Sequence, residues 1–138
     1  MNLHRKASGW QMFDYPVELV WRALTDHATG NLVDPMSESE YNKTPQPGTV
    51  YTRALGSVIN QQLAFEIKTS LYTMGWDVKL HQVDRCQTKV TVTLNADFTS
   101  SKAWFFCRMG LGLGGEIRHF FKDLEYKLRN VERKLKIR

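Results

Sequence analysis

Residues 62–98, QLAFEIKTSLYTMGWDVKLHQVDRCQTKVTVTLNADF, decide the fold because apolar and polar side chains alternate through three successive segments. The alternating apolar positions are Leu63, Phe65 and Ile67, then Met74, Trp76, Val78 and Leu80, then Val90, Val92, Leu94, Ala96 and Phe98. In a strand, side chains two residues apart point to the same face, so each segment predicts a strand with one dry and one wet face. We expect short connections, near residues 72–75 and 84–88, to make the three strands neighbours in an antiparallel meander.

Residues 115–136, GEIRHFFKDLEYKLRNVERKLK, form the longest periodic element and predict a helix. Its apolar residues follow a three-four spacing, with charged residues between them. They are Ile117, Phe120, Phe121, Leu124, Leu128, Val131 and Leu135. At 1.5 Å per residue such a helix is about 30 Å long, enough to cross a sheet. A sheet with one dry face has to cover it, so we expect this helix to lie across that face.

The residues before the sheet predict one strand and one helix. Residues 3–14 favour a strand, although Gly9 weakens it. Pro16 suits the first position of a helix, and Gly30 is a stop signal for that helix. The apolar stripe of this helix consists of Val17, Val20, Trp21 and Leu24.

The remaining segments are harder to assign. Residues 31–48 are polar and contain three prolines, so they have room for at most an edge strand over 39–43. Residues 49–55 predict a short strand, and Gly56 after it indicates a bulge or bend. A short helix capped by Ser100 or Ser101 is expected to end at Met109, followed by a glycine-rich connector.

Length and composition favour one globular domain, residues 1–138. Hydrophobic residues make up 42% of the chain and charged residues 24%, which is ordinary for a folded domain. No apolar run approaches the roughly 20 residues of a membrane span, and no secretory signal is evident at the start. Cys86 and Cys107 are too few for a disulfide framework. We therefore expect a cytoplasmic protein with free thiols and no transmembrane segment.

Much of the formal charge of +5 lies near the end of the chain. Asp123, Glu125 and Glu132 interrupt this basic run, and no stacking aromatic residues accompany it. The pattern favours a solvated helix face whose cations oppose the negative end of the helix dipole. We therefore expect no nucleic-acid partner. The basic residues are Lys122, Lys127, Arg129, Arg133, Lys134, Lys136 and Arg138.

Three stretches together resemble the START/Bet v 1-like helix-grip superfamily (SRPBCC, polyketide cyclase/dehydrase-like). They are YPVELVWRALTD at 15–26, WDVKLHQVDRCQTKVTVTL at 76–94 and GLGLGGEIRHFFKDLEYKLRNVERKL at 110–135. The resemblance implies an α+β helix-grip fold, in which a curved antiparallel sheet wraps around the long C-terminal helix. It also implies an internal hydrophobic pocket. Members of the superfamily range from polyketide cyclases and aromatases to lipid carriers and hormone receptors, and residues 31–61 depart from the usual pattern. No catalytic role is carried over.

The dry face and the facing helix supply the candidate pocket residues. Large apolar and aromatic side chains suit a pocket that encloses a flat or greasy ligand, although the same residues also suit a filled core. We expect Phe106 or Met109 near the mouth of the pocket. The predicted lining is Tyr51, Phe65, Trp76, Val78, Leu80, Val92, Phe106, Met109, Ile117, Phe120 and Leu124. The leading hypothesis is therefore a domain that binds a small hydrophobic molecule as a carrier, sensor or sequestering module.

Two other functions remain open from the sequence. The same pocket could serve a cyclase or aromatase, with Asp26, His27 and Asp34 as candidates for acid–base chemistry. Alternatively, the basic helix could dock on an acidic partner through Arg129, Arg133 and Lys134. A homodimer is compatible with either hypothesis.

Metal and cofactor sites are not expected. Glu116 and His119 have a metal-binding spacing on the last helix, but the other histidines offer no matching ligands. We therefore predict no metal site and no cofactor.

Overall fold

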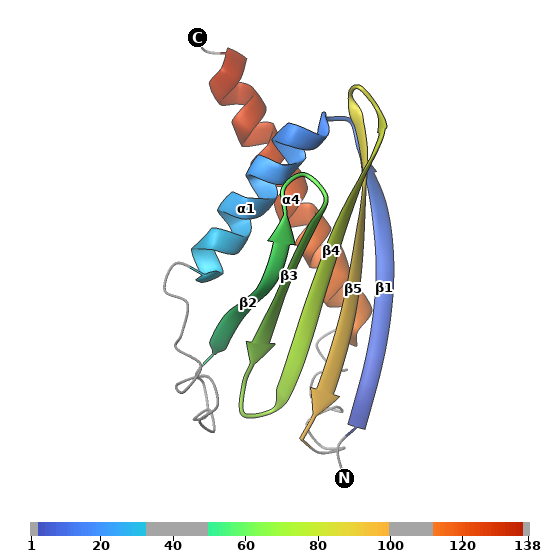
Figure 1. Ribbon diagram of the computed structural model, residues 1–138, viewed down its shortest axis with the longest axis vertical. Helices are drawn as coiled ribbons and strands as arrows, with labels where there is room; N and C mark the ends of the chain where they lie inside the picture. Colours follow the sequence, from blue (N-terminus) through green and yellow to red (C-terminus); the bar gives the residue numbers. More distant parts are fainter. Residues whose placement is uncertain (1–2, 33–49, 100–111, 137–138) are drawn as a thin grey trace.

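The computed structural model describes residues 3–32, 50–99 and 112–136, which form five strands and two helices (Figure 1). The expected edge strand over 39–43 and the expected short helix over 100–109 lie outside these residues. In chain order the elements are β1 (Leu3–Phe13), α1 (Val17–Leu32), β2 (Tyr51–Val58), β3 (Gln62–Lys68), β4 (Tyr72–Asp84), β5 (Gln87–Phe98) and α4 (Gly112–Lys136).

The strands form one antiparallel sheet in the order β1-β5-β4-β3-β2, so the predicted α+β architecture is confirmed. Phe65 on β3 lies opposite Trp76 on β4, and Val78 on β4 lies opposite Val92 on β5. All four side chains are buried, which places them on one face of the sheet. We call this the inner face and the opposite one the outer face. The alternation of residues 62–98 therefore predicted both the meander and its buried side.

Several boundaries differ from the sequence-based expectation. β4 begins at Tyr72, so the β3–β4 turn comprises residues 69–71 rather than 72–75. The Thr69 hydroxyl closes this turn by accepting a hydrogen bond of 3.2 Å from the Tyr72 backbone N–H. Helix α1 continues past Gly30 to Leu32, since a single glycine weakens a helix without ending it. α4 begins at Gly112, three residues before the predicted start.

Gly56 is confirmed as the site of a bulge in β2. The register between β2 and β3 shifts between Ala54 and Gly56, and Gly56 has a φ of 153°. That conformation is rarely adopted by a residue with a side chain, which explains why a glycine stands here. The strand then continues to Val58, beyond the predicted end at residue 55.

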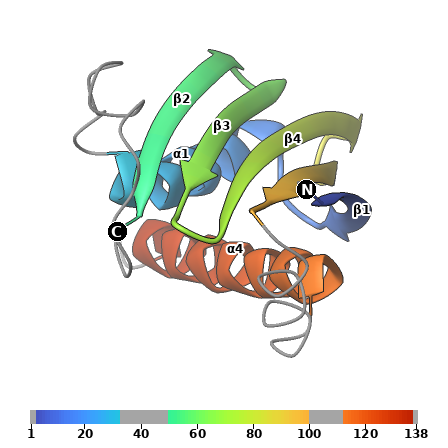
Figure 2. The same ribbon diagram turned by 90° about the horizontal axis from the view of Figure 1, so that it is seen from below.

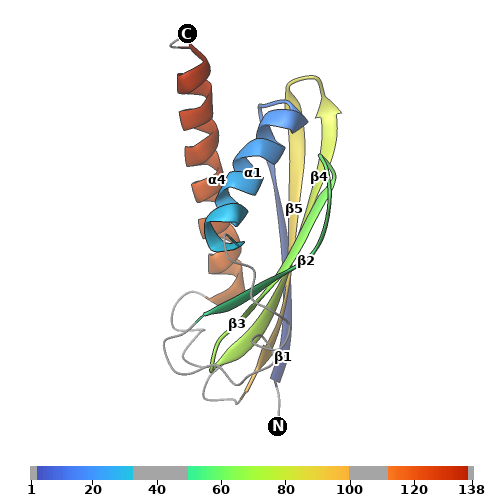
Figure 3. The same ribbon diagram turned by 60° about the vertical axis from the view of Figure 1, so that its left-hand side comes forward.

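Both helices pack on the inner side of the sheet. Figure 2 shows α4 running across this side, and Figure 3 shows α1 and α4 next to each other on one side of the strands. Five residues of the predicted stripe of α4 are buried, with Ile117, Phe120, Phe121, Leu124 and Leu128 each at most 5% exposed, whereas Val131 is half-buried and the side chain of Leu135 lies outside the described residues. Among the described helices, none combines the length and apolar character needed to cross a bilayer.

Helix α4 comes very close to the sheet at Gly9 of β1. A Cβ atom added to Gly9 would lie 3.1 Å from Cγ2 of Ile117, tighter than almost all real contacts of a Cβ. The next nearest atom, Cε2 of Phe121, would lie at 3.9 Å. Gly9, which weakens β1 as a strand, is therefore the residue that allows α4 to pack on β1.

Replacing Gly9 with valine is expected to destabilise the protein by about 2 kcal/mol, because the new methyl groups would collide with Ile117. Urea unfolding followed by circular dichroism measures this loss. Gly75→Val is the matched control, since a Cβ there would meet its nearest atom, the Asn95 carbonyl oxygen, at an ordinary 3.9 Å. A Gly9→Val variant as stable as the wild type would contradict the close approach.

Candidate functional site

The candidate site is the space between the inner face of the sheet and α4, which we call the interior. Within the described residues, the backbone of α4 is close to α1 and β1 rather than to the middle strands. Large side chains therefore span the distance between α4 and strands β3 and β4. The interior is narrow at β1, where Gly9 lies under Ile117, and is bridged by aromatic rings further across the sheet.

Five aromatic side chains form a connected cluster through the interior. Phe65 and Trp76 are stacked, with ring centroids 5.7 Å apart and planes 8° from parallel. Phe120 of α4 lies against Trp76 with a centroid distance of 5.4 Å and a tilt of 43°. Phe121 continues the cluster from Phe120 at 6.0 Å to Phe13 at 6.1 Å. Aromatic faces and edges thus make up much of the wall that joins sheet and helix.

Helix α1 occupies one end of the interior. It starts beside the β4–β5 hairpin and runs toward the edge strand β2 (Figure 1). Its buried residues Val20, Ala23 and Leu24 belong to the same hydrophobic core as the strands. Trp76 is the fifth residue of β4, near the opposite end of that strand. The rings of Phe65, Trp76 and Phe120 therefore mark the part of the interior beyond α1.

The interior that the structure describes contains little polar chemistry. Apart from Trp76, whose indole carries one N–H, Thr88 is the one buried residue among those described that has a polar side chain, and its hydroxyl donates to the Tyr15 carbonyl oxygen at 2.9 Å. No acceptor in the described residues lies within hydrogen-bonding distance of the buried Nε1 of Trp76. The described wall thus offers one unused donor and no buried charge.

The predicted lining residues fall into three groups. Phe65, Trp76 and Phe120 contact one another, and Ile117 packs over Gly9. Four others are buried in the core, with exposed fractions of 0 to 8%: Val78, Leu80, Val92 and Leu124. Phe106 and Met109 lie outside the described residues. Whether these residues contact a ligand stays a prediction.

Tyr51 is placed on the outer face, contrary to the expectation that it faces α4. It lies opposite Lys68 of β3. Phe65 and Ile67 of the same strand point to the inner face, so Lys68 and its partner Tyr51 point to the outer face. The Nζ atom of Lys68 lies 5.9 Å from the centroid of the Tyr51 ring. A strand register shifted by one residue changes the face of every side chain, and sequence alone did not fix the register of β2.

A polar hollow that the sequence did not predict lies where β1 leads into α1. It has a volume of about 380 Å³ and is formed by residues of the β1–α1 junction and of α4. The Tyr15 hydroxyl donates to Glu132 Oε2 at 2.9 Å, and Arg129 donates to Glu125 Oε1 at 2.8 Å. Burial, together with the hydrogen bond to the negative Glu132, raises the pKa of Tyr15. Tyr15 and Glu132 are 117 residues apart, so no local pattern could have paired them.

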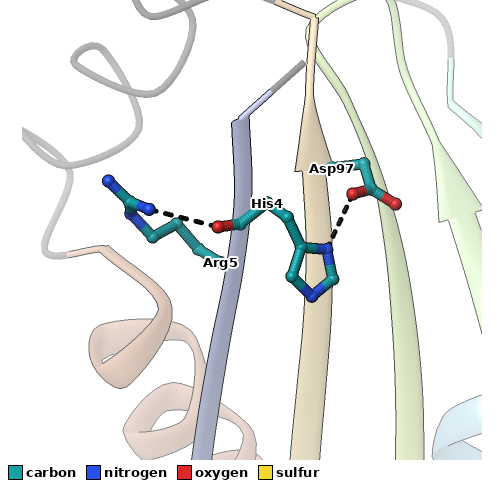
Figure 4. Close-up of polar contacts among 3 residues, drawn as sticks. All are labelled: His4, Arg5 and Asp97. Carbon is teal, nitrogen blue, oxygen red and sulfur yellow. Dashed lines mark hydrogen bonds and ion pairs between the residues drawn. The ribbon is translucent and has the colours of Figure 1, made fainter.

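The outer face carries exposed polar pairs away from the interior. His4 on β1 lies opposite Asp97 on β5, with Nδ1 and Oδ1 2.7 Å apart (Figure 4). Arg5 donates from Nη1 to the His4 carbonyl oxygen at 3.2 Å. The His4 and Asp97 side chains are 57% and 59% exposed, so solvent screens their interaction strongly.

The acid–base and metal candidates gain no support from the described geometry. The side chains of Asp26 and His27 and the whole of Asp34 lie outside the described residues. His119 contacts Asp123, with Nε2 and Oδ2 3.5 Å apart. In the described part of the chain, no group of three or more His, Cys, Asp or Glu residues could hold a metal ion.

Replacing Tyr15 with phenylalanine is expected to lower the free energy of unfolding by about 1 kcal/mol at neutral pH, through loss of the bond to Glu132. The raised pKa means that the folded state holds the phenol proton more tightly than the unfolded state. The wild type therefore loses stability as pH rises above about 10, and Tyr15→Phe should lose less over that range. Urea unfolding between pH 8 and 11 measures both slopes. The control is Tyr126→Phe, at an exposed position on α4, and equal slopes in Tyr15→Phe and the wild type would contradict the assignment.

Comparisons with known proteins identify the architecture. No family model and no curated protein sequence matches the chain. Solved structures do match. An uncharacterised protein from Rhizobium leguminosarum is 18% identical, with a TM-score of 0.63 over 94% of this chain and 97% of that one. The ZhuI aromatase/cyclase from Streptomyces sp. R1128 is 13% identical, with a TM-score of 0.59 over 96% of each chain.

The Bet v 1 homologue Ara h 8.0201 is 12% identical, with a TM-score of 0.59 over 93% of this chain and 99% of that one. Each similarity spans nearly the full length of both chains, so it concerns the overall architecture rather than a local motif. At these identities the likeness concerns the fold, and it confirms the helix-grip fold expected from the sequence. The chain has the START/Bet v 1-like helix-grip fold.

Proposed function

We propose that this protein binds a small hydrophobic molecule in the interior, between the inner face of the sheet and α4. The observation that carries the proposal is the aromatic cluster of Phe65, Trp76 and Phe120, which joins the middle strands to the helix beyond the end of α1. Rings of this kind bury large apolar areas and stack well on flat ligands. The helix-grip fold places them between two separate elements that can hold a molecule between them.

The apolar character of the described interior supports a hydrophobic ligand over an ionic one. Among the described residues no charged side chain is buried. An ion transferred into such surroundings would lose its hydration without a compensating partner, which costs many kcal/mol. An apolar molecule instead gains about 25 cal/mol for each Å² of its surface removed from water.

The lack of buried charged side chains among the described residues also favours binding over catalysis. One similar structure is an aromatase/cyclase, so an enzyme with this fold is a real alternative. Catalysis in the interior would call for two or more buried titratable groups converging on the substrate. The described interior presents none, because its buried polar groups are the Thr88 hydroxyl, which is bonded to the Tyr15 carbonyl, and the indole N–H of Trp76, which does not titrate. A role as a carrier, sensor or sequestering protein is therefore better supported than catalysis.

The third hypothesis, docking through the basic end of α4, is less well supported. Arg129 is paired with Glu125 one turn earlier, and Glu132 lies beside it in the hollow at Tyr15. The described surface of this helix thus mixes both signs of charge rather than presenting a uniformly basic face.

The proposal predicts that the purified protein takes up an apolar fluorescent dye, or carries a copurified molecule visible by native mass spectrometry. Phe120→Ser should weaken dye binding about tenfold, because it removes one wall of the aromatic cluster and adds a hydroxyl. Tyr126→Ser, on the same helix but 67% exposed, should leave the affinity unchanged. Circular dichroism checks that both variants fold.

Absence of any copurified species and of dye uptake, in a wild-type protein whose interior is fully packed, would overturn the proposed function. Equal loss of binding in Phe120→Ser and Tyr126→Ser would place the dye on the surface of α4 instead. Either result would leave the fold assignment intact.

A further inference from the structure

The indole N–H of Trp76 is buried without an acceptor among the described residues. The side chain is 7% exposed, and the indole nitrogen can donate a hydrogen bond but not accept one. A buried donor that lacks a partner costs about 1–3 kcal/mol, so such groups are rare in folded proteins. This one lies in the interior, at the centre of the aromatic cluster.

The residues around Trp76 cannot supply the acceptor. The indole ring contacts Phe65 and Phe120, and the residue opposite Trp76 on β5 is Leu94. The nearest inner-face residues along β4 are Met74 and Val78, which offer at most a thioether. β4 is a central strand paired on both sides, so its backbone carbonyls take part in the ladders with β3 and β5. The acceptor therefore has to come from outside this set.

Thr88, the other buried residue with a polar side-chain group, does have a hydrogen-bond partner. Thr88 lies near the start of β5, and its hydroxyl reaches the Tyr15 carbonyl oxygen at 2.9 Å. Within the described interior, the contrast between Thr88 and Trp76 singles out the indole N–H as the polar group without a hydrogen-bond partner.

The described residues of the interior also restrict which polar groups a bound molecule can have. They present one donor, no unused side-chain acceptor and no buried charge, so a bound molecule needs one acceptor and gains nothing from a donor or an ionised group. Phe65 and Trp76 stack on each other with ring planes within 8°, and a flat body can extend such a stack. A planar neutral ketone has these properties.

We infer that the ligand of the interior is a neutral, flat, largely apolar molecule with one hydrogen-bond acceptor, which binds the indole N–H of Trp76. The inference rests on the proposed function and specifies its ligand class. Trp76 is then the residue that distinguishes such a ligand from a hydrocarbon of the same shape.

The test compares fluorenone with fluorene, two flat tricyclic molecules that differ by a carbonyl in place of a methylene. Water solvates the carbonyl better, so an apolar interior alone would prefer fluorene. We expect the wild type to prefer fluorenone, as measured by equilibrium dialysis or by displacement of the apolar dye. Trp76→Phe keeps an aromatic ring but removes the donor, so the ratio of the two affinities should fall about five- to tenfold toward fluorene.

Trp10→Phe is the matched control, because Trp10 is 60% exposed on the outer face. This variant should keep the preference for fluorenone. A second measurement does not depend on any variant's ability to bind. Among the four tryptophans, the Trp76 indole N–H signal in a ¹H–¹⁵N spectrum should move downfield with fluorenone and stay nearly unchanged with fluorene. Trp76→Phe identifies the signal by its disappearance.

The outcomes separate this inference from the proposed function. If neither compound nor the dye binds the wild type, the proposed function fails and the ligand class fails with it. Suppose that both compounds bind, but that Trp76→Phe keeps the wild-type preference or that the indole N–H shift is the same with fluorenone and fluorene. The protein then binds apolar molecules, and the inferred hydrogen bond from Trp76 to the ligand is contradicted. Binding of fluorenone-2-carboxylate as tightly as fluorenone would overturn the requirement for a neutral ligand.

Discussion

The packing of α4 against β1 at Gly9 is the contact on which the rest of the structure depends. The sheet has one apolar face, and the hydrophobic effect requires that face to be covered. A side chain on residue 9 would hold the helix away, since even a Cβ would lie 3.1 Å from Ile117. Because α4 is fixed at the edge strand β1, its path across the remaining strands follows. The helix then lies farther from β3 and β4, where aromatic side chains fill the distance.

That geometry connects the fold to the proposed function. A helix packed equally closely along every strand would leave a core of small side chains. Here the contact tightens at one edge and depends on Trp76 and Phe120 toward the middle of the sheet. Contacts between large rings can rearrange around a flat molecule more readily than a close helix–strand contact, because rings separate without moving the sheet backbone. The proposed binding site therefore lies at the rings, and the closest contact between helix and sheet lies at Gly9.

The distribution of polar groups follows the same division. Polar pairs lie on the outer face, as at His4 and Asp97, or in the hollow at Tyr15, where water reduces the cost of their polar groups. The interior keeps two polar side chains of different status. The hydroxyl of Thr88 has a backbone partner, whereas the indole of Trp76 has none among the described residues. This asymmetry carries the inference about the ligand.

The sequence by itself determined the secondary structure and the buried faces of the best-patterned segments. Alternation over 62–98 and the three-four spacing over 115–136 follow from the geometry of strands and helices, so local order sufficed. The resemblance in three stretches also led to the right fold, although identities to the solved structures are below 20%.

Only the tertiary structure decided the register of β2, which puts Tyr51 on the outer face, and the pairing of Tyr15 with Glu132. It also decided the role of Gly9 and the missing partner of the Trp76 indole. Each of these depends on distances between residues far apart in the chain, which no local period encodes.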